Sequence, residues 1–290
     1  MKRVGFRREI PIHVWGGLGS QLHAWYLYEF LRLKFPRRRY ILVFHSSGVT
    51  RRMCELENVL DGINWIQIDD FIEQTAAPKT FKANFFPVRR ARSLVTRFGF
   101  VVSANTSSEL ERIWMLTRSI RGHYSRLPIK PEVLSAMKKQ ALHSDFNFFL
   151  APKIETASMH IRLGDLIGLE GKSHTNFERI NVAIASLESN FGSPRIVVFS
   201  DSPELVLEKI DNSKKHLVKV NPKDSNAWEE MSEMINSQYF IGTASKLSTW
   251  VCVLRIWMNP NSVNYMPSDM AEILKDQLAE MGTPESVQYY

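Results

Sequence analysis

A short stretch in the second half of the chain joins an apolar strand pattern to charged side chains. Ser158 to Arg162 has the pattern of a strand, and Arg162, Gly164 and Asp165 stand at or just after its end, with His160 inside it. A guanidinium in such a place can bind a diphosphate with two hydrogen bonds and stabilise the charge on a departing nucleotide. A structural Arg–Asp pair that caps the strand is the alternative, and spacing alone does not separate the two.

The segments around this stretch predict where those side chains lie. The second half alternates strands and helices, with proline at the first turn of the helix that begins at Pro203. This order predicts a parallel, doubly wound sheet, whose ligands bind outside the carboxyl ends of the strands. The strands are expected at 158–162, 195–200, 217–220 and 239–242, and the helices at 176–190, 203–210, 227–236 and 247–258.

The first half shows the same alternation less clearly. We expect a strand at 11–15, a glycine-rich turn from Gly16 to Ser20, a helix that Pro36 ends, and strands at 40–45 and 64–68. A helix at 132–144 follows, and 146–156 is interpreted as a passage between domains. The predicted domains are therefore 1–150 and 151–290, with a final helix at 269–281 expected to pack back on the first domain.

Composition excludes several classes of protein. The chain has 290 residues, of which 44% are hydrophobic and 23% charged, as in a soluble globular protein. No run approaches the roughly 18 apolar residues of a membrane span, and no apolar signal core follows the basic N-terminus. Cys54 and Cys252 are expected to be buried thiols, so neither a disulfide framework nor a metal cluster is predicted. We expect a cytoplasmic protein, peripheral at the inner face of a membrane.

The net charge of +7 allows nucleic acid, anionic lipid or an anionic small molecule as a partner. Thr75 to Ser108 contains no acidic residue and interleaves phenylalanines with lysines and arginines from Lys79 to Phe100. This segment is either a solvated basic surface or a surface for anionic lipid or a phosphorylated acceptor. Because no nucleic-acid-binding motif accompanies the charge, nucleic acid is a distant alternative and is not the expected partner.

Four motifs occur in the order of one enzyme family. His-Ile-Arg-Leu-Gly-Asp at 160–165 resembles the His-x-Arg-Arg-Gly-Asp motif of the bacterial α1,2-fucosyltransferases, and the run to His174 resembles the core α1,6-fucosyltransferase. Gly-Gly-Leu-Gly-Ser-Gln-Leu at 16–22 is similar to the glycine-rich opening of the α1,2 enzymes. Phe-Ser-Asp at 199–201 is shared with both, and 240–250 is a weaker match. Together the motifs cover most of the chain.

The resemblance implies an α/β fold of the GT-B type, in which two Rossmann-like domains face a cleft. It implies an inverting transfer of fucose from GDP to a hydroxyl of an oligosaccharide or lipid-linked glycan. GDP-fucose is then a co-substrate and no cofactor is needed. The sequence contains no Asp-x-Asp pair of the kind that holds manganese on a diphosphate. No metal ligands are therefore predicted, and arginine and backbone amides are expected to stabilise the diphosphate.

The resemblance also implies roles for single residues. Glu170 is the expected base, with Asp165 as the fallback or as a holder of Arg162. Asp201 is expected either on the guanine or as a helix cap, and Thr243 and Ser245 either on phosphate or as caps. His160 is expected either on the diphosphate or as a core residue that orients the strand end, and His23 either on the acceptor side or as a packing residue. The remaining expected contacts are Arg162 on the diphosphate, Glu230 on the nucleotide, Gly16, Gly17 and Gly19 near the diphosphate, and Gln21 on the acceptor side.

The departures from the family pattern bear on the donor. Leu163 replaces the second arginine of the usual pair, Ser20 replaces an asparagine, and the last motif ends Leu247-Ser248-Thr249-Trp250. Another GDP-sugar is therefore an alternative donor. A nicotinamide-dependent dehydrogenase is a remote alternative, because the turn at 16–19 lacks GxGxxG spacing. An inert binding protein of the same family is another, against which Glu170 at the family spacing argues.

Overall fold

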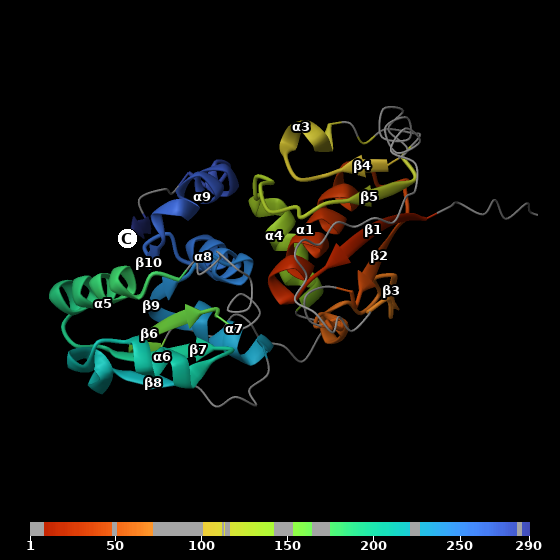
Figure 1. The fold of residues 1–290 in the computed structure, drawn as a ribbon. Coiled ribbons are helices and arrows are strands. Elements are labelled where there is room, and N and C mark those ends of the chain that lie inside the picture. The colour runs from red at the N-terminus through yellow and green to blue at the C-terminus, as the bar shows by residue number, and fades with distance from the viewer. Residues whose placement is uncertain are drawn as a thin grey trace, which may run out of the picture. The chain divides into compact units, whose positions relative to one another are not determined.

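The computed structural model divides into two compact units, Met1–Asp145 and Phe146–Tyr290. Each unit is built on a sheet whose described strand pairs are all parallel, as the sequence predicts (Figure 1). The structure describes residues 9–47, 51–71, 101–111, 113, 117–141, 153–163, 175–220, 227–282 and 286–290.

The first unit has a five-stranded sheet in the order β3-β2-β1-β5-β4. Its helix α1 packs against β1, β2 and α4. Tyr26 of α1 donates a hydrogen bond of 2.8 Å to the carbonyl of Pro128, which precedes α4. The elements are β1 (Ile10–Trp15), α1 (Leu18–Lys34), β2 (Tyr40–His45), the 3₁₀ turn η1 (Glu57–Val59), β3 (Trp65–Ile68), β4 (Val101–Ser103), α3 (Ser107–Leu110), β5 (Ser119–Arg121) and α4 (Pro131–Ala141).

The turn between β1 and α1 is shorter than predicted. Gly16 has a φ of 98°, which favours glycine, and Gly17 is the N-cap of α1. The helix begins at Leu18, so Gly19 and Ser20 are helical and do not belong to a glycine-rich loop. The prediction that the turn extends to Ser20 is therefore wrong, because the burial of α1 against the sheet outweighs the low helix propensity of glycine.

The second unit has a six-stranded sheet in the order β11-β10-β9-β6-β7-β8. Its elements are β6 (Lys153–Ile161), α5 (Phe177–Phe191), β7 (Arg195–Ser200), α6 (Pro203–Lys209), η3 (Asn212–Leu217), β8 (Val218–Val220), α7 (Ala227–Asn236), β9 (Ser237–Gly242), α8 (Lys246–Met258), β10 (Val263–Met266), η4 (Ser268–Met270), α9 (Ala271–Leu278) and β11 (Val287–Tyr289).

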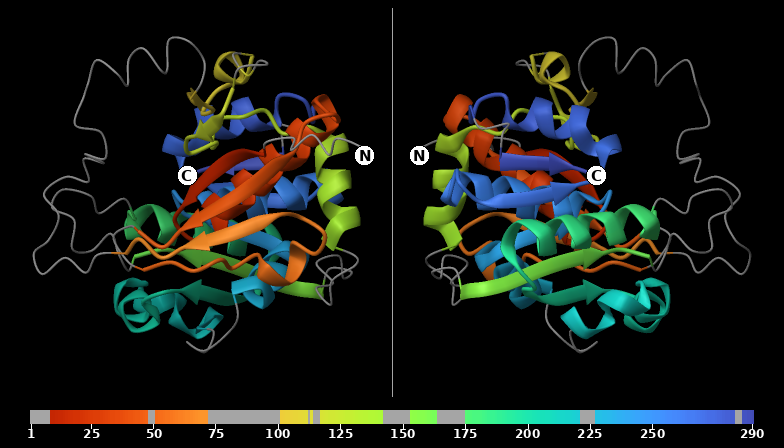
Figure 2. Two further views of the ribbon diagram at one scale, coloured as in Figure 1. Left: turned by 90° about the vertical axis from the view of Figure 1, so that its right-hand side faces the viewer. Right: turned by 90° about the vertical axis from the view of Figure 1, so that its left-hand side faces the viewer.

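Helices cover both faces of this sheet, which confirms the doubly wound prediction. Met159 and Ile161 of β6 belong to one apolar cluster with Ile184 of α5, and α5 lies beside β6 in the right-hand view of Figure 2. The alternate residues Ser158 and His160 point to the other face, where they bond with residues of α7, β9 and α8. The alternation of side chains along β6 therefore separates an apolar face of the strand from a polar face.

The predicted elements and the observed ones differ in a few places. The strand β6 begins at Lys153, inside the expected inter-domain passage, and its pairing with β9 shifts register between Lys153 and Ala157. Four strands of three or four residues, β4, β5, β10 and β11, were not predicted. They are too short to show a period, and their pairing partners come from distant parts of the chain.

Two further features follow from the described residues. Cys252 is buried, Cys54 is partly buried, and both are free thiols. Among the described residues, no helix combines the length and the apolar character that crossing a bilayer requires.

Candidate functional site

The carboxyl ends of three neighbouring strands meet at one edge of the second sheet. In the register, His160 pairs with Gly242 of β9 and Ile161 pairs with Ser200 of β7. Because the strands are parallel, the residues that follow them lie at the same edge. The structure thereby brings together five of the predicted residues, which come from segments up to 85 positions apart. They are His160, Arg162, Asp201, Thr243 and Ser245.

His160 is a buried residue whose ring is held by the start of α8. Its Nδ1 lies 2.8 Å from Ser248 Oγ and 3.3 Å from Ser245 Oγ. Burial, and secondarily the Arg162 charge, lower the pKa of His160 to about 4, although Asp201 opposes the shift. The ring is therefore neutral at pH 7, and the geometry shows it joining β6 to α8.

Two predicted phosphate ligands use their hydroxyls to build the same turn. Thr243 Oγ1 donates to the His160 carbonyl at 3.1 Å and accepts from the Arg162 amide at 3.4 Å. Ser245 is the N-cap of α8, since its side chain accepts from the Ser248 amide at 3.1 Å. The capping interpretation of Ser245 is confirmed, and a phosphate contact of either residue stays a prediction.

Asp201 fixes the segment that carries Arg162. Its Oδ1 accepts a hydrogen bond of 2.9 Å from the Leu163 amide, while Thr175 Oγ1 donates to the Arg162 carbonyl at 3.3 Å. The N-cap of α6 is Ser202. The alternative that Asp201 caps this helix is therefore wrong, and its place beside Arg162 leaves the expected nucleotide contact as a prediction.

Two cationic side chains, Lys246 and Arg162, lie near each other at this edge, which also holds the Asp201 carboxylate. Lys246 is the first residue of the 13-residue helix α8, whose first turn contains no acidic residue. Burial, and secondarily the charge of Arg162, lower the pKa of Lys246 to about 8. A lysine at the positive end of a helix dipole and near a guanidinium is electrostatically unfavourable, and a bound anion relieves that cost. Sequence reasoning missed Lys246, although a lysine after a Ser N-cap is a readable signal.

The backbone at this edge has no room for a side chain at Gly242. A Cβ there would lie 2.5 Å from Met266 Sδ and 2.9 Å from Ser248 Cβ. Tyr290 Oη also donates to the Gly242 carbonyl at 2.6 Å. Close packing of β9, α8 and the C-terminal residue therefore sets the position of the turn that carries Lys246.

The corresponding turn of the first unit already holds a carboxylate. The Leu18 amide at the start of α1 donates to Glu55 Oε1 at 3.1 Å, and a Cβ on Gly17 would lie 3.1 Å from the same oxygen. Glu55 thus stands where a phosphate would meet this helix end. Diphosphate contacts by Gly16, Gly17 and Gly19 stay predictions that these bonds do not favour.

The two residues expected on the acceptor side are buried in α1. Gln21 donates to the Met53 carbonyl at 2.8 Å and accepts from the Glu55 amide at 2.7 Å, so its amide joins α1 to the segment after β2. His23 is 2% exposed. Their acceptor roles stay predictions, since these observations describe residues that hold the first unit together.

Other predicted residues lie elsewhere. Asp165, Glu170 and the basic segment 79–100 lie outside the described residues, so their roles stay predictions. Glu230 is in the first turn of α7 and partly buried. Within the described part of the chain, no group of three or more histidine, cysteine or acidic side chains is arranged to hold a metal ion.

A hollow in the first unit lies away from the predicted chemistry. Its lining includes Arg32, Arg38, Tyr40 and Asn64, residues at the end of α1 or at the amino ends of β2 and β3. Ligands of parallel sheets bind at the opposite, carboxyl edge. The direction of the strands therefore places the expected ligand site at the other edge of the sheet, away from this hollow.

Comparison with known proteins adds structural likeness only. No family model matches the sequence, and no curated protein matches it. The chain is similar in structure to E. coli heptosyltransferase WaaC with ADP, at 11% identity and a TM-score of 0.44 over 93% of this chain and 92% of that chain. E. coli ADP-heptose LPS heptosyltransferase II gives 10% identity and 0.44 over 97% and 90%.

A third similar structure is the UDP-N-acetylglucosamine 2-epimerase of Rickettsia bellii, with 12% identity and a TM-score of 0.43 over 89% of this chain and 78% of that chain. TM-scores and identities this low assign neither a donor nor an activity. The class that the chain's own strands and helices define is an α/β protein of two parallel, Rossmann-like units. The cleft that the sequence resemblance implies stays a prediction.

Proposed function

We propose that the chain is a glycosyltransferase that moves a sugar from a nucleoside diphosphate to a hydroxyl of a glycan. The observation that carries this proposal is the cationic edge of the second sheet, where Arg162 follows β6 and Lys246 begins α8. Two cations at a helix N-terminus suit a diphosphate better than a neutral ligand, because the ligand charge offsets their mutual repulsion. Arginine can also bind two phosphate oxygens at once.

The same arrangement supports catalysis of the step in which the diphosphate leaves the sugar. When the bond between the sugar and the diphosphate breaks, negative charge grows on the diphosphate, and fixed cations stabilise that charge. The Arg162 amide donates to Thr243, and Thr175 donates to the Arg162 carbonyl. The Leu163 amide donates to Asp201, and the three bonds hold the arginine segment in one place. A preorganised cation loses little energy to rearrangement during the reaction.

The donor is proposed from the motifs, because the contacts described above bear on the diphosphate and leave the base and the sugar open. The similarity of residues 160–165 and 199–201 to GDP-fucose-dependent enzymes favours GDP-fucose or a related GDP-linked deoxy sugar. The proposed acceptor is an oligosaccharide or lipid-linked glycan of a bacterial surface polysaccharide. Another GDP-sugar is the second candidate donor, since Leu163 replaces the second arginine of the motif.

Calorimetric binding of GDP-fucose, GDP-mannose and UDP-sugars tests the proposal. We expect GDP-linked donors to bind, and Arg162→Ala and Lys246→Ala each to weaken binding by about tenfold or more, as for the loss of a charged hydrogen bond. Lys219→Ala, an exposed lysine of β8 in the same sheet, is the matched control and should bind like the wild type. No binding of any nucleotide sugar would refute the function, and preference for UDP would refute the donor.

A further inference from the structure

The hollow in the first unit has a volume of about 510 Å³, which is within the usual range for a small-molecule site. Its wall is formed by the last turns of α1, the turn that follows this helix, the first residue of β2 and a residue just before β3. Three arginines and two tyrosines contribute to the wall, namely Arg32, Arg38, Arg39, Tyr28 and Tyr40. All of these residues belong to the first unit, so the hollow is complete within that unit.

The turn between α1 and β2 fixes the position of the second and third arginines. The Arg38 amide donates to the Phe35 carbonyl at 3.0 Å, and the Arg39 carbonyl accepts from the Ile10 amide at 2.9 Å. The guanidinium carbon of Arg38 lies 5.1 Å from the centre of the Phe35 ring, which is a cation–π distance. The turn is therefore anchored to the helix at one end and to β1 at the other, and a ring supports the charged group.

Two other basic residues of this region have a structural role that needs no ligand. Arg32 forms an ion pair of 2.8 Å with the buried Glu29, and Lys34 Nζ lies 5.6 Å from the ring centres of Phe30 and Phe35. Both basic residues are also in the last turn of α1, where a cation stabilises the helix dipole. Their presence by itself does not indicate a binding site.

Arg38 and Arg39 have no comparable role. Both follow the end of α1, and among the described residues no carboxylate forms an ion pair with either guanidinium. Glu9 is an acidic neighbour of the lining, but its carboxylate accepts from the Asn64 amide group at 2.6 Å. The wall of the hollow and the partners of its residues therefore carry positive charge in excess.

Two buried donors in the wall have nothing to bond. Tyr40 is 3% exposed, and neither its hydroxyl nor the buried Nη1 of Arg38 forms a hydrogen bond of normal geometry within the described part of the chain. Burial raises the pKa of Tyr40 and the charge of Arg38 opposes the rise, so the two groups lie close together. A buried donor without an acceptor costs free energy, and a ligand that supplies the acceptor removes this cost.

We propose that this hollow binds the phosphate group of a small ligand. Arg38 and the Tyr40 hydroxyl donate hydrogen bonds to the phosphate oxygens, and Arg39 adds positive charge at the rim. A phosphate has enough acceptor oxygens to satisfy a guanidinium and a hydroxyl at the same time. The Tyr28 ring, which packs edge-on against Tyr40 at 6.5 Å, forms an apolar wall for the carbon skeleton of the ligand. The site shares no residue with the proposed donor site.

The arginines have to supply the attraction for an anion at this place. The nearest helix end is the carboxyl end of α1, which is the negative end of the helix dipole. The Phe35 amide donates to the Leu31 carbonyl at 2.8 Å, so one of the last carbonyls of the helix is already satisfied. Because the dipole does not favour an anion here, removal of one arginine of the wall should weaken binding directly.

Calorimetry of glycerol 3-phosphate with the full chain tests the proposal. We expect Arg38→Gln to weaken binding by about tenfold or more, and Tyr40→Phe by about fivefold. The control is Arg37→Gln, which removes the same charge from an exposed residue of the same turn that does not line the hollow. This variant should bind like the wild type. Equal weakening in both arginine variants would show attraction by net charge alone and would overturn the inference.

The Tyr40→Phe variant also separates a ligand contact from a structural role. The substitution removes an unsatisfied hydroxyl and keeps the ring, so without ligand the Tm should stay unchanged or rise. Glycerol 3-phosphate should then raise the Tm of the wild type more than that of the variant. A lower Tm of the variant without ligand, together with unchanged binding, would show that the hydroxyl is structural and would overturn the inference.

A local signal keeps this test independent of the proposed function. In a chain labelled with ¹³C at the tyrosine Cζ atoms, the signal that is missing from Tyr40→Phe belongs to Tyr40. We expect glycerol 3-phosphate to shift this signal in the wild type and in Arg162→Ala alike. Loss of GDP binding with an unchanged shift would refute the proposed function alone.

Vesicles distinguish a soluble ligand from a lipid headgroup. Phosphatidylcholine vesicles are compared with vesicles that also contain phosphatidylglycerol. Binding of glycerol 3-phosphate without vesicle binding supports a soluble ligand. Binding of the phosphatidylglycerol vesicles that is lost in Arg38→Gln and Tyr40→Phe, and kept in Arg37→Gln, supports a headgroup in the same hollow. No shift of the Tyr40 signal with either probe would overturn the inference.

Discussion

The two strand–turn–helix connections at the carboxyl edges of the sheets bring opposite charges to their helix starts. In the first unit the start of α1 meets the carboxylate of Glu55. In the second, α8 starts with Lys246 near Arg162, and its first turn contains no acidic residue. The start of α1 therefore meets an anion of the chain, whereas the start of α8 carries a cation, whose charge a bound anion would offset. The difference favours the second unit for the proposed diphosphate contact.

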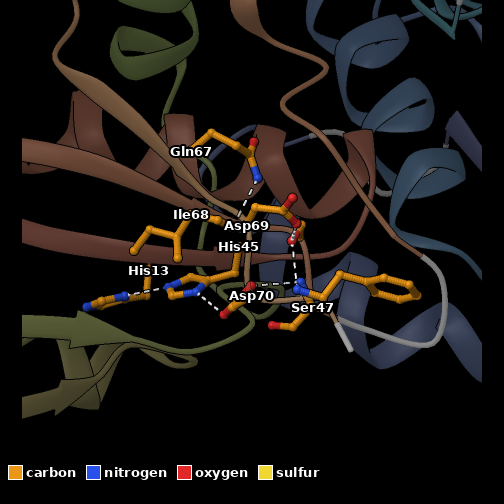
Figure 3. A network of polar contacts seen from close by, with 9 residues as sticks. His13, His45, Ser47, Gln67, Ile68, Asp69 and Asp70 are labelled. Atoms are coloured by element: carbon orange, nitrogen blue, oxygen red, sulfur yellow. Dashed lines mark hydrogen bonds and ion pairs between the residues drawn. The ribbon is translucent and has the colours of Figure 1, made fainter. Parts of the chain in front are cut away.

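The histidines of the two edges extend the comparison. Burial is the largest cause in both His13 and His160, and it lowers each pKa to about 4. His160 is 8% exposed, and its Nδ1 lies against the hydroxyls of Ser245 and Ser248. His13 of β1 is partly exposed, and its Nδ1 lies 2.8 Å from the Nε2 of His45, whose Nδ1 lies 2.7 Å from an oxygen of Asp70 (Figure 3). The same chemical group, with a pKa lowered for the same main reason, therefore contacts two hydroxyls at a helix start in one unit and a second histidine at a sheet edge in the other.

The largest expected effect concerns the stability that His160 contributes. Its folded pKa of about 4 is below the ordinary 6.5, so the unfolded chain binds the proton more tightly. Stability from this group is complete above pH 6.5 and decreases as pH falls toward 4. The expected loss is on the order of 3 kcal/mol. Urea unfolding between pH 7 and pH 4 measures it.

The control compares how steeply the unfolding free energy changes with pH in two histidine variants. His160→Gln should flatten the pH dependence of the unfolding free energy much more than His13→Gln, because His13 is more exposed and solvent reduces its contribution. Equal slopes in the two variants would remove the distinction between the histidines.

A smaller effect compares the two helix starts directly. Without ligand, Glu55→Gln removes a favourable charge from the start of α1, and Lys246→Met removes an unfavourable one from the start of α8. We expect about 1 kcal/mol of destabilisation in the first variant and a gain of similar size in the second. Thermal or urea unfolding at low salt measures both. Changes of the same sign would contradict the comparison.

The smallest effect is a pH dependence of donor affinity. Since the pKa of Lys246 is about 8, its charge is present at pH 7 and is lost as pH rises above 8. Affinity for GDP should therefore fall by about threefold between pH 7 and pH 9.5. Calorimetry of Lys246→Met should show weak binding that does not change over this range. An unchanged wild-type affinity would place the diphosphate away from Lys246.

The sequence determined the α/β class, the doubly wound second sheet and most long elements. Apolar runs such as Arg195–Ser200 and Tyr40–His45 have the length and composition of buried strands, and the observed strands β7 and β2 have the same bounds. The convergence of Arg162, Asp201 and Thr243 was also predictable, since each follows a strand and parallel strands end at one edge. The periodicity of apolar residues and the order of strands and helices along the chain are local properties, so a single sequence is enough to predict them.

Only the tertiary structure decided the partners of these residues. Glu55 reaches the start of α1 from 37 positions away. Contacts from His13 through His45 to Asp70 connect β1, β2 and the segment after β3. The role of Ser245 as a cap, and the position of Lys246 near Arg162, also depend on how α8 packs on β6 and β9. Such contacts arise from sheet register and long-range packing, which spacing along the chain does not encode.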